Sequence, residues 1–205
     1  MNEIQSPTTI REQIQFNCSN YSDRSWLISP ETSHSVSFRE VEETVLKIGQ
    51  TLLDSGIKPG SSIAIASPNS TASCLMFMAI VSAGFVAVPL NLVAGTSILA
   101  YTIDHAEVQL IFVAEECREL INLAIKEKKN DISMVLLDPI TGPDLNAIPK
   151  VENNLSIEDN SHNRDIINIF NQYHRPQSTH QIAYYTINLF IPNTPRESNT
   201  FFSFF

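Results

Sequence analysis

Residues 59–92, PGSSIAIASPNSTASCLMFMAIVSAGFVAVPLNL, constrain the fold more than any other part of the chain. An apolar, β-branched run at residues 62–66 is followed by a polar helix start, the run LMFMAIVSAG, and a second β-branched run at residues 85–88. The segment between the two runs is long enough to bring the second strand back parallel to the first. We therefore expect an α/β fold, with a layered, mostly parallel sheet and flanking helices.

The same region allows one rival interpretation, because residues 74–90 carry no charge and approach the length of a membrane-spanning helix. Gly84 and Pro89 interrupt this run, and its composition changes from helix formers to strand formers at the glycine. A spanning helix also favours basic or aromatic anchors at its ends, whereas no Lys or Arg occurs between Lys58 and Arg118. These features favour a strand, helix and strand over a transmembrane span.

Other segments extend the alternation of strands and helices. Residues 26–29 and 35–38 form a predicted hairpin, and Ser37-Phe38-Arg39-Glu40 has the pattern of a capping box at the start of a helix that ends near Gly56. After the central unit we expect a helix from about residue 96 to residue 105 with Leu99, Thr102 and Ile103 inward. The sequence then predicts a strand at 108–113, a helix at 117–129 with Leu120, Leu123 and Ala124 on one face, and a strand at 132–137.

The apolar residues are concentrated in the first two thirds of the chain, and this divides it into four predicted parts. Residues 1–25 are an arm lying on the domain, residues 26–139 are an α/β half-domain, and residues 140–180 are a polar linker or disordered segment. Residues 181–205 begin with a strand-like run, QIAYYT, and continue as an apolar and aromatic tail.

Charge and cysteine content exclude some classes of function. The formal net charge of −9 and the lack of a basic patch argue against nucleic acid as a partner. Three widely spaced cysteines, without a CxxC pair or an apolar leader, predict a reduced, cytoplasmic compartment. No His, Cys, Asp or Glu cluster has the spacing of metal ligands. We expect Cys74 to be a buried small side chain, Cys117 to be exposed, and Asp104-His105 to be a polar pair at a helix end, so no residue is assigned a catalytic role.

The ordered series SGIKPG, SIAIASPNS, SAGFVAVPLN and ILAYTIDHAEVQLIFV resembles the opening of adenylate-forming enzymes, the acyl-CoA synthetases and related AMP-dependent ligases. The resemblance covers residues 26–138. It implies activation of a carboxylate by ATP to an acyl-adenylate, with Mg²⁺, followed by transfer of the acyl group to coenzyme A. The matching stretch corresponds to scaffold that precedes the family's nucleotide-binding parts.

The resemblance also implies that a glycine-rich phosphate loop opens just after Tyr185, because Tyr184-Tyr185-Thr186 is similar to the tyrosine and threonine that begin that motif. A phosphate loop relies on glycine and lysine, but the last glycine of the sequence is Gly142 and the last lysine is Lys150. We therefore regard Tyr185 and Thr186 as a vestigial start of the ATP site and expect no cofactor for this chain. One codon assignment for residues 193–198, when it is read two bases later, encodes Tyr-Pro-Lys-Gly-Val, which is similar to the end of a phosphate loop. A frameshift before residue 190 is therefore one hypothesis for why the resemblance stops after Thr186.

Three functional hypotheses follow. The first is a fragment of an acyl-CoA synthetase of fatty acid metabolism, truncated at the phosphate loop and inactive alone. The second is half of a split ligase that is completed by a C-terminal ligase fragment. Without that fragment, the uncovered sheet surface would instead promote self-association of the chain. The third is a non-enzymatic interaction or membrane-associated module that uses the aromatic tail.

Overall fold

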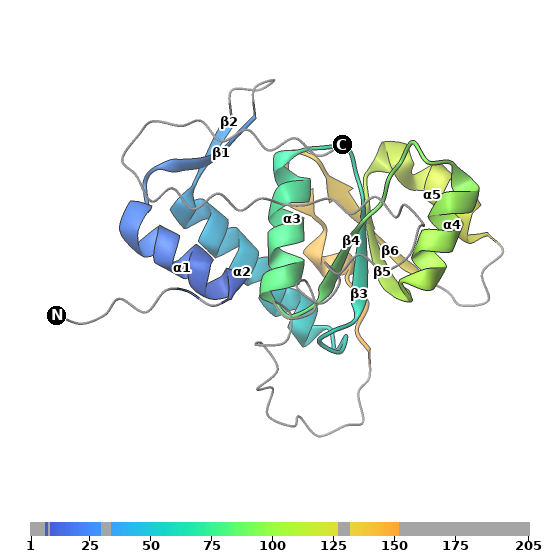
Figure 1. Cartoon of the computed structure of the whole chain (residues 1–205), viewed down its shortest axis with the longest axis horizontal. Coiled ribbons are helices and arrows are strands. Elements are labelled where there is room, and N and C mark those ends of the chain that lie inside the picture. Colours follow the sequence, from blue (N-terminus) through green and yellow to red (C-terminus); the bar gives the residue numbers. More distant parts are fainter. Residues whose placement is uncertain (1–6, 8, 30–33, 127–131, 152–205) are drawn as a thin grey trace, which may run out of the picture.

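The computed structural model describes residues 7, 9–29, 34–126 and 132–151, and the fold is drawn from these (Figure 1). The predicted linker beyond residue 151 and the tail at 181–205 lie outside the described residues. Within them, helices and strands alternate from β3 onward, so the predicted α/β class is confirmed.

The main sheet has the order β4-β3-β5-β6-β7. Its first four members are parallel, and β7 is antiparallel to β6. The pairing in the centre of the sheet is non-local, because β3 lies between β4 and β5. The bounds are Ser62–Ala66 for β3, Val86–Pro89 for β4, Val108–Val113 for β5, Ser133–Asp138 for β6 and Gly142–Pro143 for β7.

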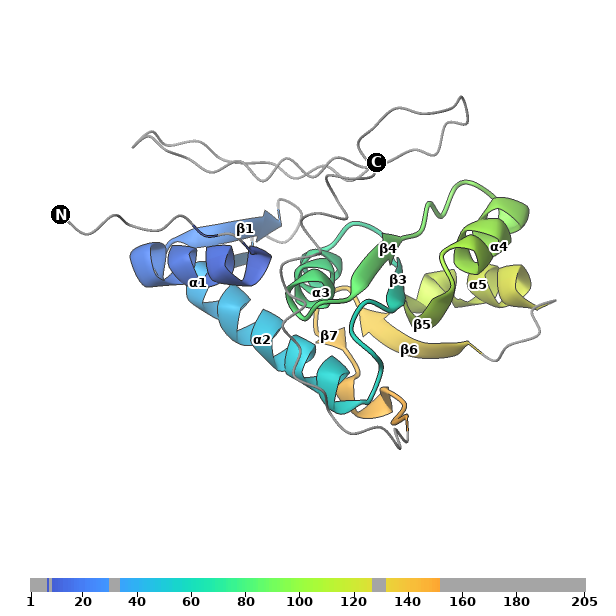
Figure 2. The same cartoon turned by 60° about the horizontal axis from the view of Figure 1, so that its bottom comes forward.

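Helices cover both faces of this sheet (Figure 2). On one face α2 (Phe38–Asp54) and α3 (Thr71–Ser82) pack over Ile63, Leu110 and Phe112. On the other face α4 (Thr96–His105) and α5 (Arg118–Ile125) pack over the alternate residues of the same strands, among them Ile111 and Val113. Because both faces are covered, β3 and β5 are apolar along almost their whole length.

The uncharged run at residues 74–90 is divided between α3 and β4. The chain turns at Gly84, whose φ of 88° favours glycine, and Phe85 then leads into the strand. The rival interpretation of a single spanning helix is therefore wrong. Across the part of the chain that the structure describes, no helix combines the length and apolarity needed to cross a membrane.

Helix α2 begins as the sequence predicts. The Ser37 hydroxyl accepts a hydrogen bond from the Glu40 N–H at 3.3 Å, and the Glu40 carboxylate accepts one from the Ser37 N–H at 2.8 Å. Val41, Val45, Ile48 and Leu52 are buried along one face. Gly56, with φ of 83°, ends the helix in a left-handed conformation.

The amino-terminal segment forms part of the core. It contains helix α1 (Ile10–Tyr21), whose Ile14 is buried, and Arg11 donates from Nε to the carbonyl oxygen of Ser82 at 3.1 Å. A hairpin of β1 (Ser25–Ser29) and β2 (His34–Ser37) follows and confirms the predicted antiparallel pair. The sequence predicted an arm lying on the domain, and the structure gives this segment a three-turn helix whose Ile14 is part of the core.

Two predictions near α5 are wrong. Ala124 is buried as predicted and Leu120 is partly buried, but Leu123 is 55% exposed, and the fully buried side chain of this helix is Ile121. Cys117 is 6% exposed, because the short 3-10 turn η1 (Glu115–Cys117) directs it into the cluster beneath α4 and α5 while Glu115 and Glu116 remain outside.

Regular structure continues past the predicted boundary at residue 139. After β7 comes a second 3-10 turn, η2 (Leu145–Ala147), and Ile148 is buried in the cluster that contains α2 and α3. The Val151 N–H donates to the carbonyl oxygen of Ser55 at 2.7 Å. Residues 140–151 are thus packed on the α/β unit and are not a linker.

Candidate functional site

The strand order places the topological switch point of the sheet, where open α/β sheets usually have their ligand crevice, at the carboxyl ends of β3 and β5. The connection from β3 leaves through α3 on one face of the sheet, whereas β5 is entered from α4 and left through α5 on the other. Adjacent strands whose connections leave to opposite faces form the usual ligand crevice of an open α/β sheet. By topology, this edge is the candidate site.

Two loops border the crevice, and a backbone bond joins their roots. The Ala114 N–H, just after β5, donates to the carbonyl oxygen of Ala66 at the end of β3 at 2.9 Å. Residues 67–70 then lead into α3, and η1 follows Ala114. The sequence positions these loops through the breaks that Pro68 and the acidic pair at 115–116 impose on the strands.

The polar groups of the first loop serve the helix that follows it. The Ser70 hydroxyl accepts from the Ser73 N–H at 3.0 Å, and the Ser73 hydroxyl accepts from the Ser70 N–H at 2.9 Å. Ser67 donates to the carbonyl oxygen of Pro68 at 3.1 Å. This arrangement caps α3 and gives it a defined start.

The second loop is acidic, which is unfavourable for a phosphate. Glu115 pairs with Arg118 at 3.0 Å across a solvent-exposed helix start, and Glu116 is exposed beside it. Neither loop contains a lysine or a glycine, the residue types that phosphate loops use. No group of three or more metal-ligating side chains occurs among residues 7, 9–29, 34–126 and 132–151. This crevice therefore has the topology of a binding site without the chemistry of a nucleotide site.

The thiols are protonated structural groups. Burial raises the pKa of Cys74 to about 12, in agreement with the predicted buried side chain. Burial, and secondarily the charge of Glu116, raises the pKa of Cys117. A hydrogen bond to Glu42 raises the pKa of Cys18. Since the thiolate is the nucleophilic form, none of the three is prepared for covalent catalysis.

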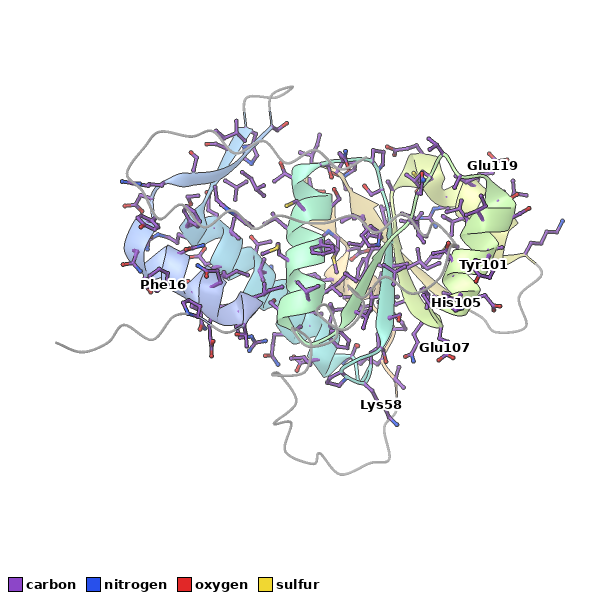
Figure 3. All side chains as sticks on the ribbon, viewed as in Figure 1. Phe16, Lys58, Tyr101, His105, Glu107 and Glu119 are labelled. Atoms are coloured by element: carbon purple, nitrogen blue, oxygen red, sulfur yellow. The ribbon has the colours of Figure 1, made fainter. Side chains whose placement is uncertain are left out.

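His105 lies at the carboxyl end of α4 and stacks on Tyr101 one turn earlier, with 5.4 Å between ring centroids and 7° between planes (Figure 3). The pair is on the outer side of the helix, away from the buried Leu99 and Ile103. The carboxyl end of α4 leads into the amino end of β5, whereas the two loops follow the carboxyl ends of β3 and β5. The histidine is a helix-end residue, as predicted, and not part of the candidate site.

Tyr185 and Thr186, the site residues predicted from the sequence, lie outside the described residues. Their position relative to the crevice and their role therefore stay predictions. What sequence reasoning missed is structural: the α1 capping box, in which Thr9 and Glu12 bond reciprocally, was signalled by the spacing T-x-x-E.

Comparison with known proteins assigns the scaffold. The AMP-binding enzyme family matches residues 14–186, which is most of the chain. The chain belongs to the AMP-binding enzyme family. The match includes α1 from Ile14 onward and residues 140–151, and both segments contribute to the same core cluster.

Curated members of the AMP-binding family share modest identity with the chain. Sulfoacetate--CoA ligase of Cupriavidus necator is 23% identical over 141 residues, which cover 69% of this chain and 27% of that protein. Long chain acyl-CoA synthetase 1 of Arabidopsis thaliana is 32% identical over 79 residues, 38% of this chain and 12% of that protein. The chain thus matches only about a quarter of the first relative's length and less of the second.

Solved structures of the AMP-binding family share the fold. The N-terminal domain of FACL13 from Mycobacterium tuberculosis superposes with a TM-score of 0.59 at 16% identity, covering 74% of this chain and 39% of that one. The structure of an anthranilate CoA ligase in complex with anthranoyl-AMP superposes with a TM-score of 0.58 at 19% identity, and the match covers 66% of this chain and 26% of that one. The described sheet and helices therefore correspond to part of the N-terminal domain of adenylate-forming ligases.

Proposed function

We propose that residues 1–205 provide the N-terminal scaffold of an ATP-dependent acyl-CoA synthetase and do not activate a carboxylate by themselves. The observation that carries the proposal is the chemistry of the two loops at the crevice. Ser70 in the first loop caps α3 through reciprocal hydrogen bonds with Ser73, and the second loop is acidic at Glu115. The sequence supports it, since neither glycine nor lysine follows residue 150. A complete enzyme of this class would use ATP, Mg²⁺ and coenzyme A, and the carboxylate would be an acyl group whose length the scaffold does not select.

Calorimetric titration of the 205-residue chain with MgATP tests this proposal. We expect no heat of binding from a chain whose circular dichroism shows it to be folded, while a full-length acyl-CoA ligase, the positive control, binds. Micromolar binding would contradict the proposal. If binding appeared and were lost in the double variant Tyr185→Ala, Thr186→Ala, the vestigial loop would be a working phosphate site.

A second candidate is half of a split ligase, and exposed apolar side chains favour it. Val93 is 92% exposed in the loop before α4, and Ile98 and Tyr101 on α4 are 56% and 62% exposed. Apolar groups of this size at neighbouring positions are typical of contact surfaces. Mixing the chain with a ligase fragment that begins at the phosphate loop, and measuring pyrophosphate release with ATP and a fatty acid, tests this candidate. Release only from the mixture supports it, whereas inactivity despite binding of the fragment contradicts it.

A further inference from the structure

The outer face of α4 is apolar and aromatic, although it is turned away from the core. Leu99 and Ile103 face the core, whereas Ile98, Tyr101 and His105 are exposed. The three exposed residues are three and four positions apart, so they form one row along the helix. Single exposed apolar side chains are common on protein surfaces, but a continuous row of them is typical of an interaction site.

The turn before α4 holds a further apolar side chain outside the core. The Ala94 N–H donates to the Asn91 carbonyl oxygen at 3.1 Å, and the Val93 N–H donates to the Asn91 side-chain oxygen at 3.2 Å. In this turn Leu92 packs on the cluster beneath α4, whereas Val93 is exposed. We call Val93 and the exposed row on the helix the α4 stripe.

Tyr101 has the properties of an anchor for a partner. Its ring stacks on the His105 imidazole, and both residues belong to the same helix. A ring that is held by its neighbour loses less conformational freedom when a partner binds. Tyrosine is also among the residue types that carry most of the binding energy at protein interfaces.

The surroundings of the α4 stripe are acidic. Residues 91–126 contain five Asp or Glu and two Lys or Arg, a formal net charge of −3 (2 − 5). Asp104 and Glu107 lie at and just beyond the carboxyl end of α4, and Glu119 is exposed on α5, which packs beside α4. Figure 3 shows Glu107 and Glu119 at the same end of the molecule as Tyr101. A partner that covers the stripe therefore meets negative charge around it.

These charges select among the possible occupants of the stripe. A second copy of the chain would bring the same carboxylates to the interface, and an anionic lipid surface would be repelled. The rest of this chain, residues 152–205, is also acidic, with five Asp or Glu and three Lys or Arg. A partner that carries cations beside apolar side chains complements both features of the surface.

We propose that the α4 stripe docks a partner protein through an amphipathic helix of that partner. The apolar residues of the helix cover Ile98 and Tyr101, and its Lys or Arg side chains lie opposite Asp104 and Glu119. A helix suits the stripe because its own apolar residues recur at three and four positions, the spacing of the stripe itself. This interaction goes beyond the scaffold role, since it involves neither ATP nor the loop that caps α3.

NMR titration of the isotope-labelled 205-residue chain with a designed peptide tests the proposal. The probe repeats Leu and Lys at helical spacing, and the control peptide has Glu in place of Lys. We expect the Leu/Lys peptide to shift the amides of Val93 and α4, to bind at least about tenfold more tightly than the Leu/Glu peptide, and to bind more weakly as salt is raised. Shifts confined to other surfaces, or equal binding by the two peptides, would overturn the proposal.

Substitution of the stripe identifies the side chains that bind the probe. The double variant Ile98→Ala, Tyr101→Ala should bind the Leu/Lys peptide at least about tenfold more weakly than the parent. Ile28→Ala and Ile140→Ala remove exposed isoleucines elsewhere and should leave the affinity unchanged. An affinity that survives the double variant would overturn the proposal.

A charge variant keeps the test decisive if the alanine variant is poorly folded. Asp104→Lys with Glu119→Lys leaves the apolar residues in place and should weaken binding of the Leu/Lys peptide about threefold or more. Glu43→Lys with Asp54→Lys changes the net charge equally on the exposed side of α2 and should have less effect. Equal effects of the two pairs would assign the binding to net charge and overturn the proposal.

The other occupants give distinct outcomes. Shifts of the α4 amides when the chain alone is concentrated would mean that a second copy covers the stripe. Shifts of these amides by a ligase fragment that begins at the phosphate loop would mean that the stripe belongs to a split ligase. Either result would overturn the proposal. The peptide titration contains no ATP, so failure of this inference is distinguishable from failure of the ATP-binding proposal.

Discussion

Glu107 occupies a backbone conformation that suits glycine. It follows the end of α4 with φ of 50°, the single positive φ of a non-glycine residue in the described ranges, and its N–H donates to the carbonyl oxygen of Asp104 at 2.9 Å. The left-handed conformation costs an L-residue about 1–2 kcal/mol, and glycine avoids this cost. Glycine also loses more conformational entropy on folding, so only part of the avoided cost appears as added stability.

We therefore predict that Glu107→Gly raises the free energy of unfolding by about 0.5–1 kcal/mol. Urea denaturation followed by circular dichroism measures this change. Glu107→Ala is the matched control, because it removes the same carboxylate and keeps the unfavourable φ, and it should leave stability nearly unchanged. Equal effects of the two substitutions would assign the gain to charge removal instead.

Asp138 closes the turn between β6 and β7. Its carboxylate accepts hydrogen bonds from the N–H groups of Thr141 and Ile140, both at 2.8 Å, and these bonds hold its pKa below the ordinary value for aspartate. A depressed pKa in the folded state means that the ionised form stabilises the fold. This contribution is complete above the unfolded-state pKa and is lost as the pH falls through the folded-state pKa.

Asp138→Asn should therefore be less stable than the parent at pH 7, and the difference should shrink as the pH is lowered below about 4. Urea midpoints of both proteins between pH 3 and pH 7 give the comparison. Glu43→Gln, on the exposed side of α2, serves as the control for general charge effects. A difference between Asp138→Asn and its parent that stays constant with pH would refute the role assigned to the ionised carboxylate.

At the scale of elements, Gly49 of α2 lies against Ala79 and Ala83 at the end of α3. A Cβ atom built there would lie 3.2 Å from the Ala83 Cβ and 3.6 Å from the Ala79 carbonyl oxygen. The small residues on both helices set this distance, because the contact leaves room for no larger side chain.

Gly49→Leu should lower the free energy of unfolding by about 1–3 kcal/mol, as overpacking does in a close-packed core. Lys47→Leu, on the exposed side of the same helix, adds the same side chain outside the contact and should be nearly neutral. Thermal unfolding of the two variants separates them. Equal stability of both would mean that the helices can shift apart freely.

How well each element could be predicted depends on whether its signals agree. For α2 the capping box, the apolar spacing and the terminal glycine all indicate the same bounds. In α1 the T-x-x-E box is present, but the apolar stripe is weak, with only Ile14 buried, so the spacing of Ile10 and Ile14 indicates no more than a short helix. In α5 two apolar stripes are compatible with helical spacing, and tertiary packing selects the one with Ile121 over the one with Leu123.

The site was less predictable than the fold for a physical reason. Charged neighbours made Cys117 look exposed, yet a single 3-10 turn rotates it inward, and a local change of helix type is not visible in residue spacing. The crevice depends on strand order, in which β5 inserts beside β3, and this is a long-range property. The predicted phosphate-loop residues lie outside the described residues, so their placement stays a prediction.

At the scale of the whole molecule, residues 140–151 fasten the end of the sheet to α2. Ile148 is 7% exposed in the core cluster, whereas Ile140, in the turn before β7, is 85% exposed. If this segment is part of the folding unit, the two isoleucines must differ in their effect on stability.

Ile148→Ala should lower the free energy of unfolding by about 2–4 kcal/mol, and Ile140→Ala by less than about 0.5 kcal/mol. Both are measured by urea denaturation of the 205-residue chain. Similar small effects at the two positions would restore the interpretation of residues 140–180 as a linker.

The position of β3 between β4 and β5 also affects how the protein is made. As the nascent chain leaves the ribosome, α3 emerges with apolar side chains on every side, and β3 gains its second neighbour only after residue 113 has been synthesised. Local contacts alone do not bury these groups, and non-local parallel pairing is slow. Until β5 arrives, the apolar side chains of α3 and β3 lack their final cover, so the interval between the synthesis of residues 66 and 113 is one in which the nascent chain is prone to aggregation.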